Sequence, residues 1–76
     1  MPKLPVISGL EARHAFERAG WVFVRVGSSR HMILRKPGFV VALSIPGHRT
    51  LDRGLLRSLI RDAGLTVEEF NDLLQE

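Results

Sequence analysis

Residues 21–45 read WVFVRVGSSRHMILRKPGFVVALSI and hold three runs dense in β-branched and aromatic residues. Such residues favour strands, whereas the GSS at positions 27–29 and the PG at positions 37–38 favour turns between them. Because Pro-Gly is typical of a tight turn, the second and third runs are expected to form a hairpin. The stretch therefore predicts three consecutive antiparallel strands, at residues 21–26, 31–36 and 39–45.

The third run alternates, and the strand period of two assigns its residues to two faces of the sheet. The face expected to pack under helices holds Phe39, Val41, Leu43 and Ile45, and the opposite face holds Val40, Ala42 and Ser44. If Met32 and Leu34 belong to the buried set, the outward residues of the second run are His31, Ile33 and Arg35.

Helix signals flank the three strands on both sides. Two pairs match the capping box, in which each side chain satisfies a backbone donor at a helix start; they are Ser8 with Glu11 and Thr66 with Glu69. Apolar residues recur at helical spacing behind both pairs and before Gly64. Helices are therefore expected at residues 8–19, at about 52–63 and, as a short last helix, from Thr66 onward.

The predicted order of elements is α-β-β-β-α-α. Three consecutive antiparallel strands covered on one face by two helices form a two-layer α+β sandwich. Its α-β-β-β-α core has the arrangement of a double-stranded-RNA-binding domain, followed by an extra short C-terminal helix. A chain of 76 residues is expected to form one domain over residues 1–76.

Composition excludes several classes of protein. The chain has no cysteine, which excludes a disulfide framework, a cysteine zinc site and thiol catalysis. The longest apolar run is residues 21–24, far short of the roughly 20 residues needed to span a bilayer, and no secretory signal pattern precedes it. A reducing cytoplasm is the expected location, and no membrane contact is predicted.

Charge is segregated along the chain. Residues 1–17 are neutral, and residues 62–76 hold five acids and no base. Residues 18–61 hold nine basic residues against one acid, a formal charge of +8. A basic stretch that is also rich in strand residues is typical of a polyanion-binding surface, most often for nucleic acid, because Lys and Arg release counterions from phosphates. A solvated charged face is about equally compatible with this pattern.

Histidines are the main candidates for chemistry. His14 lies beside the apolar stripe of the first helix and is interpreted as a surface residue. His31 follows a loop of glycine, serines and Arg30, and an imidazole beside a bound phosphate can exchange a proton with an RNA 2′-hydroxyl or 5′-oxygen. From local sequence alone, a packing or hydrogen-bonding role for His31 is favoured over a catalytic one by about two to one. His48 either binds phosphate or caps the helix that follows it.

Taken in order, several short motifs resemble one family. The resemblance runs from about Val6 to Phe70 and rests on Ser8-Gly9, Ala19-Gly20-Trp21, Val24-Arg25, Gly27 to His31, Arg35-Lys36-Pro37-Gly38, Ile45-Pro46-Gly47-His48 and residues 54–65. The chain resembles HicA-type toxins, also described as YcfA-like, of HicA–HicB toxin–antitoxin pairs. The resemblance implies a double-stranded-RNA-binding-like fold that cleaves mRNA, with one catalytic histidine on the second strand, four positions before Arg35. That histidine is His31.

The resulting hypothesis is a metal-independent endoribonuclease with mRNA as substrate, a HicB-like antitoxin as partner and no cofactor. His31 is the expected catalytic residue. The expected RNA contacts are Arg25, Ser28, Ser29, Arg30, Arg35, Lys36, His48, Arg53 and Arg57. Two other hypotheses share the same charge pattern: a non-catalytic RNA-binding module, and a subunit whose basic face docks an acidic protein.

Overall fold

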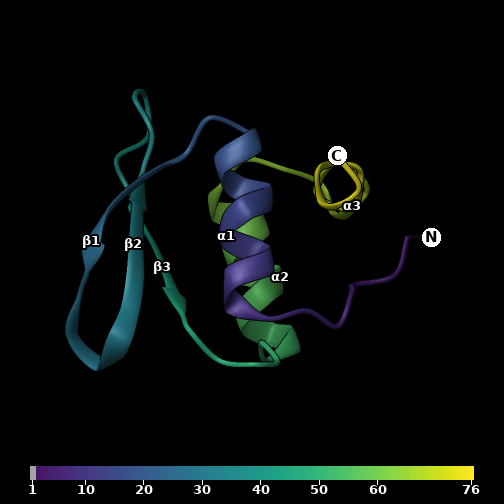
Figure 1. The fold of residues 1–76 in the computed structure, drawn as a ribbon. Helices are drawn as coiled ribbons and strands as arrows, with labels where there is room; N and C mark the ends of the chain where they lie inside the picture. Colours follow the sequence, from purple (N-terminus) through teal and green to yellow (C-terminus); the bar gives the residue numbers. More distant parts are fainter. Residues whose placement is uncertain (1) are drawn as a thin grey trace.

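The computed structural model describes residues 2–76, and its elements follow the α-β-β-β-α-α order that the sequence predicts (Figure 1). They are α1 (Gly9–Arg18), β1 (Val22–Val26), the 3₁₀ turn η1 (Ser28–Arg30), β2 (His31–Arg35), β3 (Leu43–Pro46), α2 (Arg53–Asp62) and α3 (Val67–Leu74). Within residues 2–76 no helix has both the length and the apolar character needed to cross a bilayer.

Each helix begins where a side chain satisfies a free backbone N–H group. Ser8 Oγ accepts a hydrogen bond from the Glu11 N–H at 3.1 Å, and a Glu11 carboxylate oxygen accepts one from the Ser8 N–H at 3.0 Å. Thr66 and Glu69 make the same reciprocal pair at the start of α3. Both predicted capping boxes are confirmed, and the Asp52 carboxylate caps α2 in a simpler way. Each cap of this kind contributes about 1 kcal/mol.

The sheet is antiparallel, with strand order β1-β2-β3. Met32 and Leu34 of β2 are buried, and they pair across the ladder with Ile45 and Leu43 of β3, which are also buried. This confirms the predicted buried set for β2 and for the second half of the third run. The intervening residues of β2, beginning with His31, therefore lie on the opposite face of the sheet.

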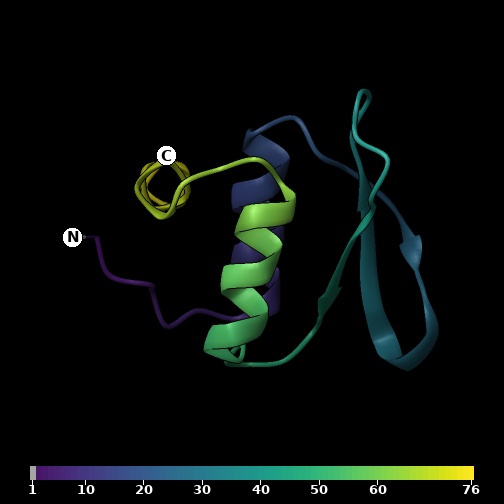
Figure 2. The same ribbon diagram turned by 180° about the vertical axis from the view of Figure 1, so that it is seen from behind.

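Helices cover only one face of the sheet. Figures 1 and 2 show α1 and α2 between the strands and α3, which lies on the far side of the helix pair. The Phe16 ring of α1 packs on the Phe70 ring of α3, with centroids 5.0 Å apart. The short C-terminal helix thus adds a layer behind the predicted sandwich and leaves the other face of the sheet open.

The third strand is shorter than predicted. β3 begins only at Leu43, and residues 39–42 form bends and irregular chain after Gly38, which has a left-handed φ of 89°. The expected burial of Phe39 and Val41 is therefore wrong, since their side chains are 37% and 55% exposed.

The end of β2 explains this difference. Leu43 pairs with Leu34, and β2 ends one residue later at Arg35, so residues 39–42 have no strand to pair with. The Phe39 ring packs on the Trp21 ring instead, with centroids 5.0 Å apart. This aromatic contact, rather than strand pairing, holds the start of the loop against the rest of the protein.

The start of α1 contacts the end of β3 so closely that no side chain fits between them. A Cβ atom at Gly9 would overlap the Pro46 carbonyl oxygen. The Gly9 N–H donates to the His48 carbonyl at 2.9 Å, and the Leu51 N–H donates to the Ile7 carbonyl at 2.8 Å. These bonds hold the loop that carries His48 against the first helix.

Candidate active site

An open hollow of about 300 Å³ lies on the helix-free face of the sheet, at the end where β1 passes into β2. Its side-chain lining comes from all three strands and the η1 turn, namely Arg25, Ser28, Ser29, His31, Ile33 and Ser44, with Gly27 at the edge. Among the described residues that line it, Arg25 and His31 are the ionisable ones and neither is acidic. The hollow is therefore suited to an anionic ligand.

His31 is held by the turn that precedes it. Its ring Nδ1 lies 3.2 Å from the carbonyl oxygen of Ser28 and 3.2 Å from that of Ser29. Because carbonyl oxygens only accept hydrogen bonds, Nδ1 must carry the proton in the neutral ring. This geometry assigns the tautomer and leaves the lone pair on Nε2, so the neutral ring is prepared to accept a proton there.

The η1 turn adopts an uncommon backbone conformation. Ser29 and Arg30 have φ values of 57° and 59°, in the left-handed region that L-residues with side chains rarely occupy. The Gly27 N–H donates to the His31 carbonyl at 2.7 Å and closes the turn. Backbone strain of this kind persists where the surrounding structure enforces it and concentrates at functional sites. Here the turn places the carbonyl oxygens of Ser28 and Ser29 within hydrogen-bonding distance of His31 Nδ1.

A β-bulge turns Arg25 toward His31. Phe23 pairs with the buried Leu34, whereas Arg25 pairs with Ile33, and Val24 between them has no partner across the ladder. In a regular strand Phe23 and Arg25 would share a face, because they are two residues apart. The extra residue places them on opposite faces, with Phe23 against the core and Arg25 in the hollow.

Ser44 is the one polar side chain in the lining that the sequence-based list of contacts omits, since the other omitted residues are Gly27 and Ile33. It pairs with Ile33 across the β2–β3 ladder, and its side chain is exposed on the open face. The signal was present in the alternation of the third run, which assigned Ser44 to the face opposite the buried set. Only the register shows that this position lies beside His31.

The remaining predicted contacts lie outside the hollow. Arg30 and Arg35 are exposed at the start and the end of β2, and His48, Arg53 and Arg57 are exposed in and after the loop that follows β3. The Lys36 ammonium donates to the Ala19 carbonyl at 2.7 Å, at the C-terminal end of α1. The structure therefore brings Arg25, Ser28 and Ser29 together with His31. Arg30 and Arg35, called the basic surround below, lie at the two ends of β2, whereas Arg53 and Arg57 belong to α2, on the other side of the sheet (Figure 1).

Arg57 lines a second hollow, of about 420 Å³, at the junction of α2 and α3. Arg61 and Thr66 share it with the apolar residues Ile60, Leu65 and Val67. It contains no histidine, and it has no lining residue in common with the hollow at His31. The two hollows are separate sites.

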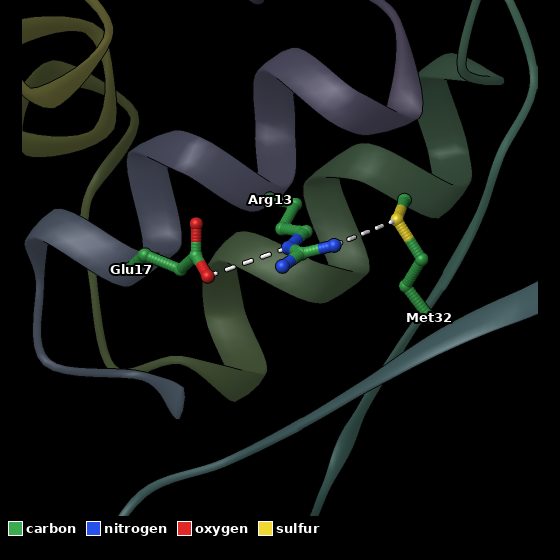
Figure 3. Close-up of polar contacts among 3 residues, drawn as sticks. All are labelled: Arg13, Glu17 and Met32. Carbon is green, nitrogen blue, oxygen red and sulfur yellow. Dashed lines mark hydrogen bonds and ion pairs between the residues drawn. The ribbon is translucent and has the colours of Figure 1, made fainter. Parts of the chain in front are cut away.

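Behind the His31 hollow, on the helix-covered side, Arg13 of α1 is fully engaged (Figure 3). Its Nε lies 3.3 Å from a carboxylate oxygen of Glu17, and its Nη1 lies 3.9 Å from the sulfur of Met32. The guanidinium carbon also sits 3.9 Å from the centroid of the Phe23 ring. Arg13 thus braces β1 and the residue that directly follows His31.

A metal-binding cluster is not found in the described part of the chain. Within residues 2–76, no three His, Cys, Asp or Glu side chains come close enough together to hold an ion. The polar groups that line the hollow are the imidazole of His31, the guanidinium of Arg25 and the hydroxyl groups of three serines.

Comparison with known proteins identifies the family. No curated protein matches the chain at a significant level. A family model described as the HicA toxin of bacterial toxin–antitoxin systems matches residues 10–65, a span that includes α1, the whole sheet and α2. This match confirms the resemblance seen in the sequence motifs. Because it covers most of the chain, the protein belongs to the HicA toxin family.

Proposed function

We propose that this toxin is an endoribonuclease that cleaves mRNA and so inhibits translation, with His31 as its general acid–base residue. The observation that carries the proposal is the fixed tautomer of His31, whose Nδ1 is tied to two backbone carbonyls beside a cationic hollow. A base must be oriented before it can accept a proton efficiently, and the η1 turn supplies that orientation.

The reaction uses a nucleophile that the substrate already carries. His31 Nε2 removes the proton from an RNA 2′-hydroxyl, and the resulting oxygen attacks the adjacent phosphorus. Because no water has to be activated, this transesterification needs no metal ion or other cofactor. A well-placed general base contributes about 10²–10⁴-fold to such a step.

The basic surround supplies affinity for the RNA backbone. Arg30 and Arg35 are exposed at the two ends of β2, the strand that carries His31. For a single strand, each phosphate contact makes the slope of log affinity against log salt concentration more negative by about 0.7. Binding is therefore expected to weaken steeply as salt increases.

Inhibition of the toxin by an antitoxin is expected, because the family consists of toxins of toxin–antitoxin pairs and the site is positively charged. A cognate HicB-like antitoxin has to keep RNA away from His31, and an acidic surface on that partner would associate rapidly with the basic surround. We place this toxin–antitoxin pair in the prokaryotic cytoplasm, where its mRNA substrate is found.

The test compares His31→Ala with His14→Ala, a matched control on the exposed side of α1. His31→Ala is expected to reduce RNA cleavage at least 100-fold and to abolish growth arrest on induction, with an unchanged circular dichroism spectrum. His14→Ala is expected to retain both activities, and EDTA to have no effect.

Full activity of His31→Ala, or cleavage that requires a divalent metal, would contradict this proposal. Salt-sensitive RNA binding with no cleaved product, in the wild-type chain, would instead indicate a non-catalytic RNA-binding module.

A further inference from the structure

The hollow at His31 is lined by one imidazole and by no carboxylate. In RNA transesterification the 2′-oxygen enters on one side of the phosphorus and the 5′-oxygen leaves on the other, roughly in line. His31 offers only Nε2, because Nδ1 is tied to the carbonyl oxygens of Ser28 and Ser29. A single imidazole nitrogen cannot take the proton from the 2′-oxygen and at the same moment stabilise the leaving 5′-oxygen on the opposite side of the phosphorus. The charge that builds up away from His31 needs another stabilising group.

We propose that Arg25 is a second catalytic residue, whose guanidinium stabilises the charge on the phosphoryl oxygens and on the leaving 5′-oxygen. This inference rests on the proposed ribonuclease function. In the step, the 2′-oxygen–phosphorus bond forms, and the 2′-hydroxyl proton moves to His31 Nε2. The phosphorus–5′-oxygen bond breaks, its electron pair stays with the oxygen, and that oxygen takes a proton from water. The products are a 2′,3′-cyclic phosphate and a 5′-hydroxyl end.

The position of Arg25 depends on the unpaired Val24. Without the bulge at Val24, Arg25 would share the helix-covered face with Phe23, and its guanidinium could not reach the phosphate. Gly27 provides the space for the side chain, because a Cβ atom there would lie 3.3 Å from both Arg25 Nη1 and Ile33. The bulge and the glycine together direct the guanidinium into the hollow that His31 lines.

Arg25 also keeps its charge free for a ligand. In the chain from residue 2 to residue 76, the one ion pair joins Arg13 to Glu17, and no side chain or backbone group makes a hydrogen bond to the Arg25 guanidinium. A guanidinium that is not neutralised by a carboxylate can stabilise the negative charge that develops in the transition state. Arginine also binds phosphate through two parallel N–H groups, which lysine cannot do.

The first experiment measures cleavage of a short oligoribonucleotide by Arg25→Gln, Arg25→Lys and, as the comparison, Arg35→Gln. Arg35 lies on the same face and on the neighbouring strand, outside the hollow. Arg25→Gln is expected to lower kcat about 100-fold with a KM change of a few-fold, and Arg25→Lys to recover only a small part of the loss. Arg35→Gln is expected to raise KM with little change in kcat. An Arg25→Gln variant that changes KM alone would overturn the proposal.

The second experiment exchanges neighbours, as Val24→Arg combined with Arg25→Val. This double variant keeps the composition and charge of β1 but moves the guanidinium to the bulge position. It is expected to lose kcat as Arg25→Gln does while still binding RNA at low salt, and full activity would show that the bulge does not direct the guanidinium.

The pH dependence of the rate separates the two catalytic groups. An arginine side chain stays charged at every pH at which the rate would be measured. Arg25→Gln is therefore expected to keep the shape of the wild-type pH–rate profile, with a lower rate at each pH. Loss of one limb of that profile in Arg25→Gln would overturn the electrostatic role. If His31→Ala is fully active the ribonuclease proposal itself fails, whereas an inactive His31→Ala with a fully active Arg25→Gln removes only the role of Arg25.

Discussion

Arg13 reaches the sheet from its helix-covered side, and Arg25 projects from its open side. The first is held by Glu17, the Met32 sulfur and the Phe23 ring, whereas the second has no ion-pair partner among residues 2–76 and lies beside His31. Arg13 belongs to the neutral segment of residues 1–17, whereas Arg25 belongs to the segment of residues 18–61 that carries a formal charge of +8. The difference shows that a basic residue contributes to the candidate site only where the fold leaves it without a partner.

The largest expected effect comes from truncating one residue on each face of β2. Leu34 is fully buried, and Leu34→Ala is expected to lower the free energy of unfolding by about 2–5 kcal/mol, because it leaves a cavity in the core. Ile33→Ala, on the open face, is expected to cost about 1 kcal/mol, since that side chain is only half-buried. Urea unfolding followed by circular dichroism measures both.

Equal losses for these two variants would mean that the faces of β2 are assigned to the wrong residues, as after a one-residue slip in register. Leu34→Val, expected to cost about 1 kcal/mol, keeps the comparison measurable if the alanine variant does not fold.

Arg13→Met is expected to have an intermediate effect, limited to stability. It removes a cation–π contact and a half-exposed ion pair, which together contribute about 1 kcal/mol, while methionine retains an apolar stem on β2. The salt dependence of RNA binding is expected to stay the same, because the lost charge lies between α1 and the covered face of the sheet. Thermal unfolding and a salt titration of RNA binding measure the two quantities.

A flatter salt dependence in Arg13→Met would show that Arg13 also contacts RNA, and the contrast with Arg25 would then fail. Glu17→Gln is the matched variant, since it breaks the same ion pair and leaves the arginine charge in place.

Features that depend on neighbouring residues in the chain were predictable from sequence. The caps at Ser8 and Thr66 require only a partner three residues later, and both occur as expected. The open-face position of His31 also follows from local alternation once Met32 and Leu34 are assigned to the core. Local signals thus identified the helices, the order of the strands and the face of the sheet on which His31 lies.

Features that depend on pairing between strands were not predictable. Nothing in the residues around Val24 indicates that it lacks a partner, because a bulge is a property of two strands, and so the direction of Arg25 could not be derived. Ser44 was omitted from the site for the same reason, since its place beside His31 follows from its pairing with Ile33. The hydrogen bonds from Nδ1 of His31 require the left-handed η1 turn, which serine and arginine do not predict.

The smallest expected effect tests where the two faces of the sheet end. Alternation extends the third strand back to residue 39, but Val40 is 94% exposed and lies in the loop before β3. Val40→Ser is therefore expected to change the free energy of unfolding by less than about 0.5 kcal/mol, as do most surface substitutions. Phe39→Ala, beside it, is expected to cost more, because it removes the ring that packs on Trp21. A loss above about 1 kcal/mol for Val40→Ser would mean that residues 39–42 pair as a strand in solution, and that the open face of the sheet extends further than β3.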